Sequence, residues 1–313
     1  MDRQKSLQIR ADELRRHISY LARTASIELT PKEILQAAPY RKLLAAGTQV
    51  YVPHVPRERP VEIISAVRAL LADGMVPVPH IAARRLKAEV ELDELLDQLQ
   101  EAGCTQALII GGGSAIPEGP FESALQVLHS GKLERAGFRR IGIAGHPEGS
   151  PDISNEALRQ AYFEKVQLAG SGVFDMYIVT QFSFDAPAVL SWEKMLRKDD
   201  NALSIHVGLA GVTSATKLLK FAAICGVKAS AGFLKQGVPA LGRLLTRWSP
   251  NAMILEIASH MQQDPKSSIR QLHFFPFGGF PDTVDWLKAL GDGRYELIEE
   301  KNEIRLVVEA DAS

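Results

Sequence analysis

Cysteine is scarce in this chain of 313 residues, which has only Cys104 and Cys225. Two distant thiols provide neither a disulfide framework nor the ligand spacing of a cysteine-based zinc site, so a reducing cytoplasm is the expected location. No apolar run reaches the roughly 18 residues that a membrane-spanning helix requires. The first residues are charged and lack an apolar segment, which argues against a signal peptide.

An excess of charge of either sign is also missing, because 36 basic residues face 37 acidic ones. Without a basic stripe or a charged tail, neither nucleic acid nor a membrane surface is an expected partner. We expect small-molecule ligands, and the sequence leaves open whether the chain forms a homo-oligomer. With 46% hydrophobic residues, it can build one large α/β domain or two small ones.

Short apolar runs alternate with helical patterns along the chain, which predicts right-handed crossovers and a parallel sheet. The expected strands are residues 25–29, 48–52, 76–79, 107–110, 141–144, 176–182, 203–208 and 272–275. The expected helices between them are residues 31–45, 60–72, 90–102, 119–136, 154–168, 186–196 and 214–225. Eight strands are the closing number for a (β/α)8 TIM barrel.

The pattern predicts three parts of the chain. Residues 1–22 form an amphipathic N-terminal helix, residues 23–292 the barrel, and residues 293–313 a C-terminal hairpin with its turn at Lys301 and Asn302. The long connection before the last strand should hold extra helices at residues 239–246 and 251–261.

Polar side chains stand where the expected strands end, the edge that carries chemistry in parallel barrels. Glu28 lies inside an apolar strand, so its pKa should rise and suit it as a general acid. The alternative is a structural carboxylate paired with an Arg or Lys. Gln181 follows the strand at 176–179, and its amide suits a polar heterocycle, although it would equally well tie down a loop.

Histidines occur near several of the same strand ends, at positions 54, 80, 146 and 273. They would suit a metal or a large aromatic cofactor, but no local ligand spacing supports a metal, so we expect none. Gly111, Gly112 and Gly113 would let backbone approach a ligand, although such loops are common without one. Other histidines, at positions 17, 129 and 260, are expected on solvated helix surfaces.

Taken in order, these segments resemble the methylenetetrahydrofolate reductase family over roughly residues 20–290. The resemblance rests on ASIELTP, VPHIAAR, IIGGGSA, IAGHPE, AGSG, VTQFSFD and LHFFPF, of which VTQFSFD and GHPE are the most specific. It implies a (β/α)8 barrel with FAD at the strand carboxyl ends. It also implies hydride transfer from NAD(P)H through the flavin to a tetrahydrofolate-bound methylene, in one-carbon metabolism.

The resemblance also implies roles for single residues. Glu28 matches the catalytic acid that protonates folate N10, and Gln181 matches the glutamine that contacts the pterin. The expected folate site adds Phe182 and His273. The expected cofactor site comprises His54, His80, Gly111, Gly112, Gly113, His146, Glu148 and Lys165.

This chain departs from the family's pattern mainly around the flavin. The family usually has Arg-Gly-Asp where this chain has three glycines at 111–113, which removes a phosphate partner and predicts weaker FAD binding. Two alternative functions remain. One is the same chemistry run towards oxidation of 5-methyltetrahydrofolate, and the other is a flavin-free folate-binding partner protein.

Overall fold

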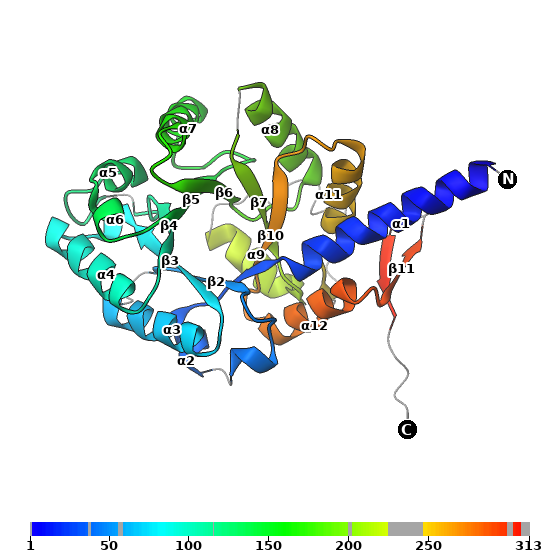
Figure 1. Ribbon diagram of the computed structural model, residues 1–313, viewed down its shortest axis with the longest axis horizontal. Coiled ribbons are helices and arrows are strands. Elements are labelled where there is room, and N and C mark those ends of the chain that lie inside the picture. The colour runs from blue at the N-terminus through cyan, green and yellow to red at the C-terminus, as the bar shows by residue number, and fades with distance from the viewer. Residues whose placement is uncertain are drawn as a thin grey trace. The chain divides into compact units, whose positions relative to one another are not determined.

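The computed structural model describes residues 2–36, 39–55, 59–114, 116–199, 202–224, 247–298 and 303–307 (Figure 1). Eight strands close into a barrel in the order β1-β10-β7-β6-β5-β4-β3-β2, and the registers from β1 to β6 are parallel. Their bounds are β1 Ser26–Glu28, β2 Gln49–Val52, β3 Val76–Ala82, β4 Gln106–Ile110, β5 Arg140–Gly145, β6 Asp175–Thr180, β7 Ser204–Ala210 and β10 Ile269–Phe275. The predicted (β/α)8 fold is confirmed.

Helices alternate with these strands. They are α1 Asp2–Arg23, α2 Pro31–Gln36, α3 Pro60–Ala72, α4 Glu89–Glu101, α5 Ala124–His129, α6 Lys132–Arg135, α7 Asn155–Gly170, α8 Ala186–Lys198, α9 Ala215–Ile224, α11 Asn251–Gln263 and α12 Phe280–Gly291. The described residues also form two 3-10 turns, η1 Tyr40–Lys42 and η2 Ala83–Arg85. Two antiparallel strand pairs lie outside the barrel: β8 Thr213–Ser214 with β9 Arg247–Trp248, and β11 Tyr295–Ile298 with β12 Glu303–Leu306. None of the helices described is both long and apolar enough to cross a membrane.

Several predicted elements have different bounds. The helix expected at 31–45 is the short α2, followed after Pro39 by η1, and the helix expected at 119–136 is broken into α5 and α6. Gly131 causes that break, because its φ of 68° lies in the left-handed region. Strand β3 runs on to Ala82, which places His80 inside the strand. The predicted helix at 239–246 and the hairpin turn lie outside the described residues.

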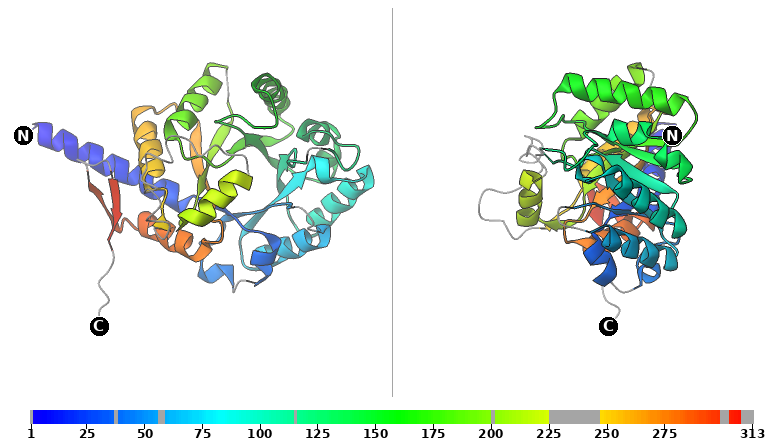
Figure 2. Two further views of the ribbon diagram at one scale, coloured as in Figure 1. Left: turned by 180° about the vertical axis from the view of Figure 1, so that it is seen from behind. Right: turned by 90° about the vertical axis from the view of Figure 1, so that its left-hand side faces the viewer.

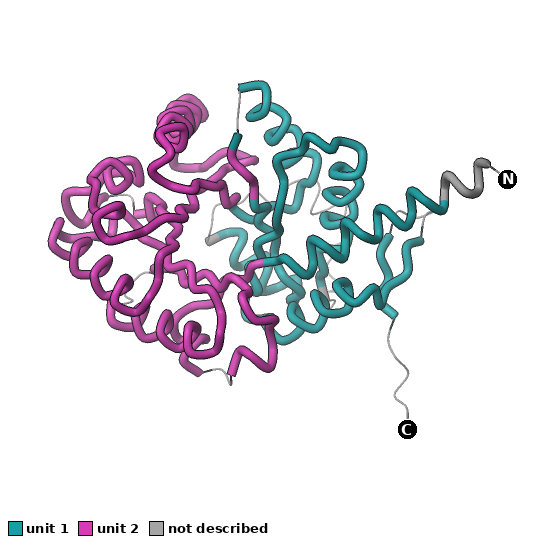
Figure 3. The backbone as a smooth tube through the Cα atoms, in the orientation of Figure 1, with its two compact units in different colours: residues 1–25, 181–202, 206–313 teal, residues 26–180, 203–205 magenta. Residues whose placement is uncertain are grey.

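The chain divides into two compact units, coloured separately in Figure 3. Unit 1 consists of residues 1–25, 181–202 and 206–313, and unit 2 of residues 26–180 and 203–205. The boundary after β6 therefore falls between Thr180 and Gln181.

Unit 2 has its core on the inner side of strands β2 to β6. Side chains two residues apart on a strand share a face, and the inward ones form a cluster of Tyr51, Val78, Leu108, Tyr177 and Val179. Burying each such side chain contributes about 1.5–3 kcal/mol. The cluster thus sets which face of each strand is turned inward, and with it the direction of the side chains at the strand ends.

Unit 1 includes the N-terminal helix. Helix α1 packs against α11 and α12 (Figure 2), where Ile18 and Leu21 are fully buried. Farther towards the start of the same helix, Ile9 is 55% exposed. The amphipathic pattern is therefore satisfied mainly over the second half of α1.

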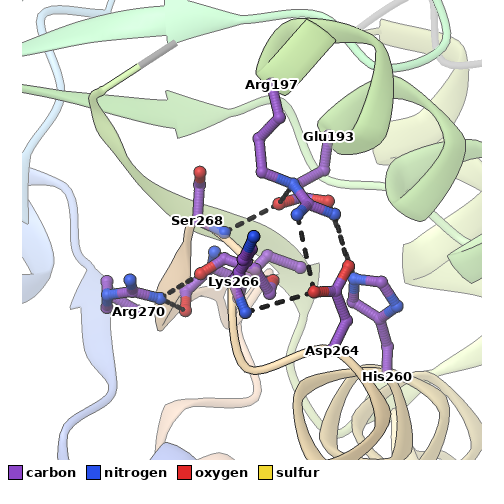
Figure 4. A network of polar contacts seen from close by, with 9 residues as sticks. Glu193, Arg197, His260, Asp264, Lys266, Ser268 and Arg270 are labelled. Atoms are coloured by element: carbon purple, nitrogen blue, oxygen red, sulfur yellow. Dashed lines mark hydrogen bonds and ion pairs between the residues drawn. The ribbon is translucent and has the colours of Figure 1, made fainter. Parts of the chain in front are cut away.

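A polar network in unit 1 surrounds the fully buried carboxylate of Glu193 on α8 (Figure 4). Arg197 Nε lies 2.7 Å from one carboxylate oxygen, and the backbone N–H of Ser268 donates to the same oxygen at 2.7 Å. The other oxygen lies 3.6 Å from Nε2 of His260, and Arg197 also pairs with Asp264. His260 is only 7% exposed, so the prediction of a solvated surface histidine was wrong: the residue faces a buried carboxylate.

Removing the centre of this network should destabilise the fold. Truncating one member of a buried, hydrogen-bonded ion pair leaves the others desolvated and costs about 3–5 kcal/mol. We expect that loss in the free energy of unfolding for Glu193→Ala, measured by urea denaturation. Asp292→Ala is the matched control, because it removes an exposed pair with Arg294 that is worth about 0–1 kcal/mol. Equal losses in the two variants would contradict this assignment.

Candidate active site

Glu28 is the last residue of β1, and the chain turns immediately after it into α2. Thr30 begins that helix: the Glu33 carboxylate accepts from the Thr30 backbone N–H at 2.9 Å and from its hydroxyl at 2.8 Å. Pro31 stands at the first helical position, where no N–H is needed. This capping box ends the strand abruptly and fixes Glu28 at its carboxyl end.

The carboxyl group of Glu28 faces a histidine from another strand. Its Oε2 lies 3.3 Å from Nε2 of His80, and the two side chains are 19% and 8% exposed. Burial raises the pKa of Glu28, the positive charge that His80 can carry opposes this shift, and the nearby Glu33 adds to it. The expected rise in pKa is confirmed, and the partner is a histidine where an Arg or Lys had been the alternative.

His54 follows β2 in the same unit and is half-buried. Its Nδ1 is buried and, within the described ranges, has no hydrogen-bond partner. Burial lowers the pKa of His54, and the charge of Arg85 lowers it further. The ring is therefore neutral near pH 7, with a nitrogen available to a ligand.

The glycines after β4 have different environments. Gly112 has a φ of 101°, and a Cβ built there would lie 2.8 Å from the Cβ of Ala82. Gly112 is thus required by the fold alone. A Cβ at Gly111 or Gly113 would meet nothing within 4 Å, so the backbone there borders open space.

His146, just after β5, and Lys165, on α7, also lie in unit 2. Burial lowers the pKa of His146 to about 4, and the charge of Lys165 contributes to the shift. Burial likewise lowers the pKa of Lys165. A half-buried ammonium next to a neutral imidazole would gain by meeting an anion, because a negative charge offsets its lost hydration. Glu148, two residues after His146, is half-buried as well.

Unit 1 holds the residues expected to bind folate. The Oε1 of Gln181 accepts from the backbone N–H of Phe182 at 3.0 Å, so this amide does tie down its own loop, as the alternative held. Among the residues that the structure describes, its NH2 group has no hydrogen-bond acceptor. His273, inside β10, is fully buried, and burial lowers its pKa to about 3.

Aromatic rings gather in unit 1 around Phe182. Phe277 stacks on Phe221 with ring centroids 4.5 Å apart and lies edge-on to Phe182 at 5.0 Å. Phe275 contacts both Phe182 and His273, at 5.6 and 4.6 Å. Phe277 has a φ of 49°, which is uncommon for a residue with a side chain, and Gly278 continues that turn with a φ of 73°. The turn after β10 therefore holds an apolar, half-buried aromatic surface.

The predicted site residues thus form two groups, one in each unit. The unit 2 group holds the carboxyl, imidazole and ammonium groups, and the unit 1 group holds an amide, a buried histidine and aromatic rings. In the part of the chain that the structure describes, no three His, Cys, Asp or Glu side chains gather as metal ligands.

Two buried tyrosines next to this site were not identified from the sequence. The hydroxyl groups of Tyr51 and Tyr177 lie 3.0 Å apart inside unit 2, and the Tyr51 ring contacts His80 edge-on at 6.0 Å. Each tyrosine is spaced two residues from another inward-facing position of its strand, and this spacing was the available sign that the side chain points into the barrel. It was not sufficient, because tyrosines in apolar strands usually have only a packing role.

A model of the family described as methylenetetrahydrofolate reductase matches residues 57–275, well over half of the chain. The chain belongs to the methylenetetrahydrofolate reductase family. Methylenetetrahydrofolate reductase 2 of Saccharomyces cerevisiae is 21% identical over 167 residues. That match covers 51% of this chain and 27% of the yeast protein, so the chain matches about a quarter of the length of this relative.

Among solved structures, the chain is similar to an uncharacterized protein from Clostridium thermocellum that binds two copies of 5-methyl-5,6,7,8-tetrahydrofolic acid. The TM-score is 0.55 at 10% identity, with 86% of this chain and 94% of that chain covered. At that identity the likeness concerns the fold, which again is the barrel.

The glycine loop of this methylenetetrahydrofolate reductase family member provides a direct test of its geometry. Gly112→Ala should cost about 1–3 kcal/mol of unfolding free energy, because the new Cβ meets Ala82 and the backbone conformation is strained. Gly111→Ala is the control, with open space and no positive φ, and should change stability by less than about 1 kcal/mol. Thermal melts of both variants check this, and a larger loss in Gly111→Ala would refute it.

Proposed function

We propose that the protein is an oxidoreductase that interconverts 5,10-methylenetetrahydrofolate and 5-methyltetrahydrofolate with NAD(P)H. The observation that carries the proposal is the partly buried carboxyl of Glu28, at a strand end, with a raised pKa and His80 at 3.3 Å. Family membership supplies the substrate class, because the site alone defines only a carboxyl group with a raised pKa.

The chemistry requires such an acid. Hydride can reach the folate methylene carbon only after the five-membered ring has opened to an iminium, and opening requires a proton on N10, a weakly basic nitrogen. A carboxyl whose pKa is raised by burial holds its proton to higher pH than an exposed carboxyl does, which suits it to donate that proton to N10. His80 is placed to share that proton and to orient the carboxyl group.

The residues of unit 2 fit a bound flavin dinucleotide. His54 has a buried nitrogen available for a hydrogen bond, and Lys165 is a half-buried cation that would gain from a phosphate. Gly111 and Gly113 leave space for a ring beside the backbone. FAD would supply a reversible hydride acceptor and donor when bound. His54, His80, His146, Glu148 and Lys165 are the side chains proposed to hold it.

Folate would be held by residues of unit 1. The NH2 of Gln181, which donates to none of the described residues, can donate to a pterin edge, and the half-buried Phe275 and Phe277, packed on the buried Phe182, offer aromatic surface for its rings. His273 is fully buried and neutral because burial lowers its pKa, and its ring lies edge-on to Phe275 at 4.6 Å, so it would support this aromatic surface without adding charge.

A second candidate is a methylfolate-binding protein without flavin. The Clostridium thermocellum protein of similar fold binds 5-methyltetrahydrofolic acid, and the three glycines at 111–113 replace the charged pair typical of the family. Absorbance spectroscopy of the purified protein, incubated with FAD and then freed of unbound FAD by gel filtration, separates the candidates. A flavin band that NAD(P)H bleaches supports the oxidoreductase, whereas 5-methyltetrahydrofolate binding with no flavin band supports the binding protein.

Glu28→Gln tests the role of the acid. The variant should slow the folate half-reaction by at least the factor of about 10²–10⁴ typical of general acid catalysis and largely spare the nicotinamide half-reaction. Rapid mixing measures the two separately. Glu62→Gln, which changes an exposed carboxyl at the start of α3, is the control and should leave both unchanged. Equal losses in both half-reactions of Glu28→Gln would make Glu28 a structural or cofactor-positioning residue.

The same variant should not lose stability. Because the folded-state pKa of Glu28 is raised, the carboxylate destabilises the fold above the unfolded pKa, and this cost vanishes as the pH falls below that value. Glu28→Gln should therefore melt at or above the wild-type temperature at pH 8, and the gain should shrink towards about pH 4. Melting well below wild type at pH 8 would show that the ionised carboxylate is structural.

Gln181→Ala should mainly weaken folate binding. Loss of one amide contact to the pterin costs about 0.5–1.5 kcal/mol, and loss of the bond to the Phe182 N–H costs a similar amount of stability. Gln49→Ala is the matched control, because it removes one side-chain bond, to Gln106, at the first residue of β2. Calorimetric titration with folate and thermal melts measure both effects. A collapse in melting temperature with normal folate affinity would make Gln181 purely structural.

A further inference from the structure

Two tyrosine hydroxyl groups meet inside unit 2. Strands β2 and β6 are four positions apart in the order of eight, so they face each other across the barrel axis. Tyr51 from β2 and Tyr177 from β6 reach across and bring their hydroxyl oxygens to 3.0 Å, with both side chains fully buried. This hydrogen bond braces the inside of the barrel between opposite strands.

Residues of β5 make room for the Tyr177 ring and contact it. A Cβ at Gly142 of β5 would lie 3.1 Å from Cζ of Tyr177, so the tyrosine occupies space that only glycine leaves. The guanidinium of Arg140 lies over the Tyr177 ring at 4.9 Å and pairs with Asp175 at 3.0 Å. Burial raises the pKa of Tyr177 to about 12 and that of Tyr51 well above its usual range, so both hydroxyl groups keep their protons at physiological pH.

The Tyr51–Tyr177 pair adjoins His80, which in turn contacts Glu28. Tyr51 is the register partner of Glu28, and its ring contacts His80 edge-on, with ring centroids 6.0 Å apart at 79°. His80 in turn lies 3.3 Å from the Glu28 carboxyl. Among the charged groups that act on Glu28, His80 of β3 lowers its pKa and Glu33 of α2 raises it, so moving His80 away would remove an interaction that favours the carboxylate.

We propose that Tyr51 and Tyr177 are positioning residues, whose hydroxyl bond holds the Tyr51 ring against His80 and thereby keeps the imidazole at the Glu28 carboxyl. This inference rests on the proposed function and adds residues that never touch the substrate. Without the bond, the Tyr51 ring is free to tilt, and His80 loses one of the surfaces that fix its orientation. An imidazole that moves away no longer favours the carboxylate, so the pKa of Glu28 rises further.

Phenylalanine variants separate positioning from packing. Tyr177→Phe removes the hydroxyl that bonds to the buried Tyr51 hydroxyl, which destabilises the fold, whereas Tyr51→Phe with Tyr177→Phe removes both polar groups and should regain most of the lost stability. A packing role predicts that the site recovers with the stability. A positioning role predicts that the site stays perturbed in the stable double variant.

The experiment uses the full chain with 13C-labelled glutamate carboxyl groups, followed by NMR as a function of pH. The Glu28 signal is identified by its loss in Glu28→Gln. We expect its titration midpoint to move to higher pH by about half a unit or more in the single and double variants, and the folate half-reaction to slow by about tenfold. Tyr295→Phe is the matched control, because it removes a buried hydroxyl that donates to the Arg15 carbonyl in unit 1, and it should leave the Glu28 midpoint unchanged.

An unchanged or lowered midpoint in the stable double variant would overturn the proposal, as would an equal rise in Tyr295→Phe. The titration requires no substrate, so it tests the positioning role even if the protein does not turn over folate. In that case the proposed function fails and the positioning of Glu28 by the tyrosines is still tested.

Discussion

Polar atoms inside a closed barrel must find partners in the protein, and this constraint governs unit 2. Water is excluded there, so each buried hydroxyl, imidazole or carboxyl either pairs or shifts its protonation. Tyr51 and Tyr177 pair with each other, and Glu28 pairs with His80. The same burial that favours the pairing also raises the pKa of Glu28, which is the property that the proposed acid requires.

The two units carry different chemistry. Unit 2 holds the ionisable groups, with Glu28, His80, His146 and Lys165 at or after strand ends, whereas unit 1 contributes the aromatic surface around Phe182. The chain passes from one to the other between Thr180 and Gln181, within the stretch that is most typical of the family. The ionisable and the aromatic candidate residues thus belong to separate compact parts.

Much of this arrangement was predictable from the sequence, because it depends on local periodicity. Alternating strands and helices predicted the barrel, and the apolar neighbours of Glu28 predicted its raised pKa. Contacts across the barrel were not predictable, since the bond between Tyr51 and Tyr177 joins residues 126 apart in sequence. His260 was misplaced for the same reason: its helix gives no sign of the buried carboxylate of Glu193, which comes from another helix.

Gly142 has a consequence for the evolution of the family. A Cβ at this position would approach both the Leu108 and Tyr177 side chains, at 2.9 and 3.1 Å. A methyl group at 142 would therefore require the tyrosine ring and the Leu108 side chain to shift, so residue 142 cannot grow without a response from its neighbours. Among descendants of this chain, residues 142 and 177 should covary, with tyrosine retained only where glycine is retained. A lineage that gains a larger residue at 142 would give up the cross-barrel hydroxyl bond in the same step.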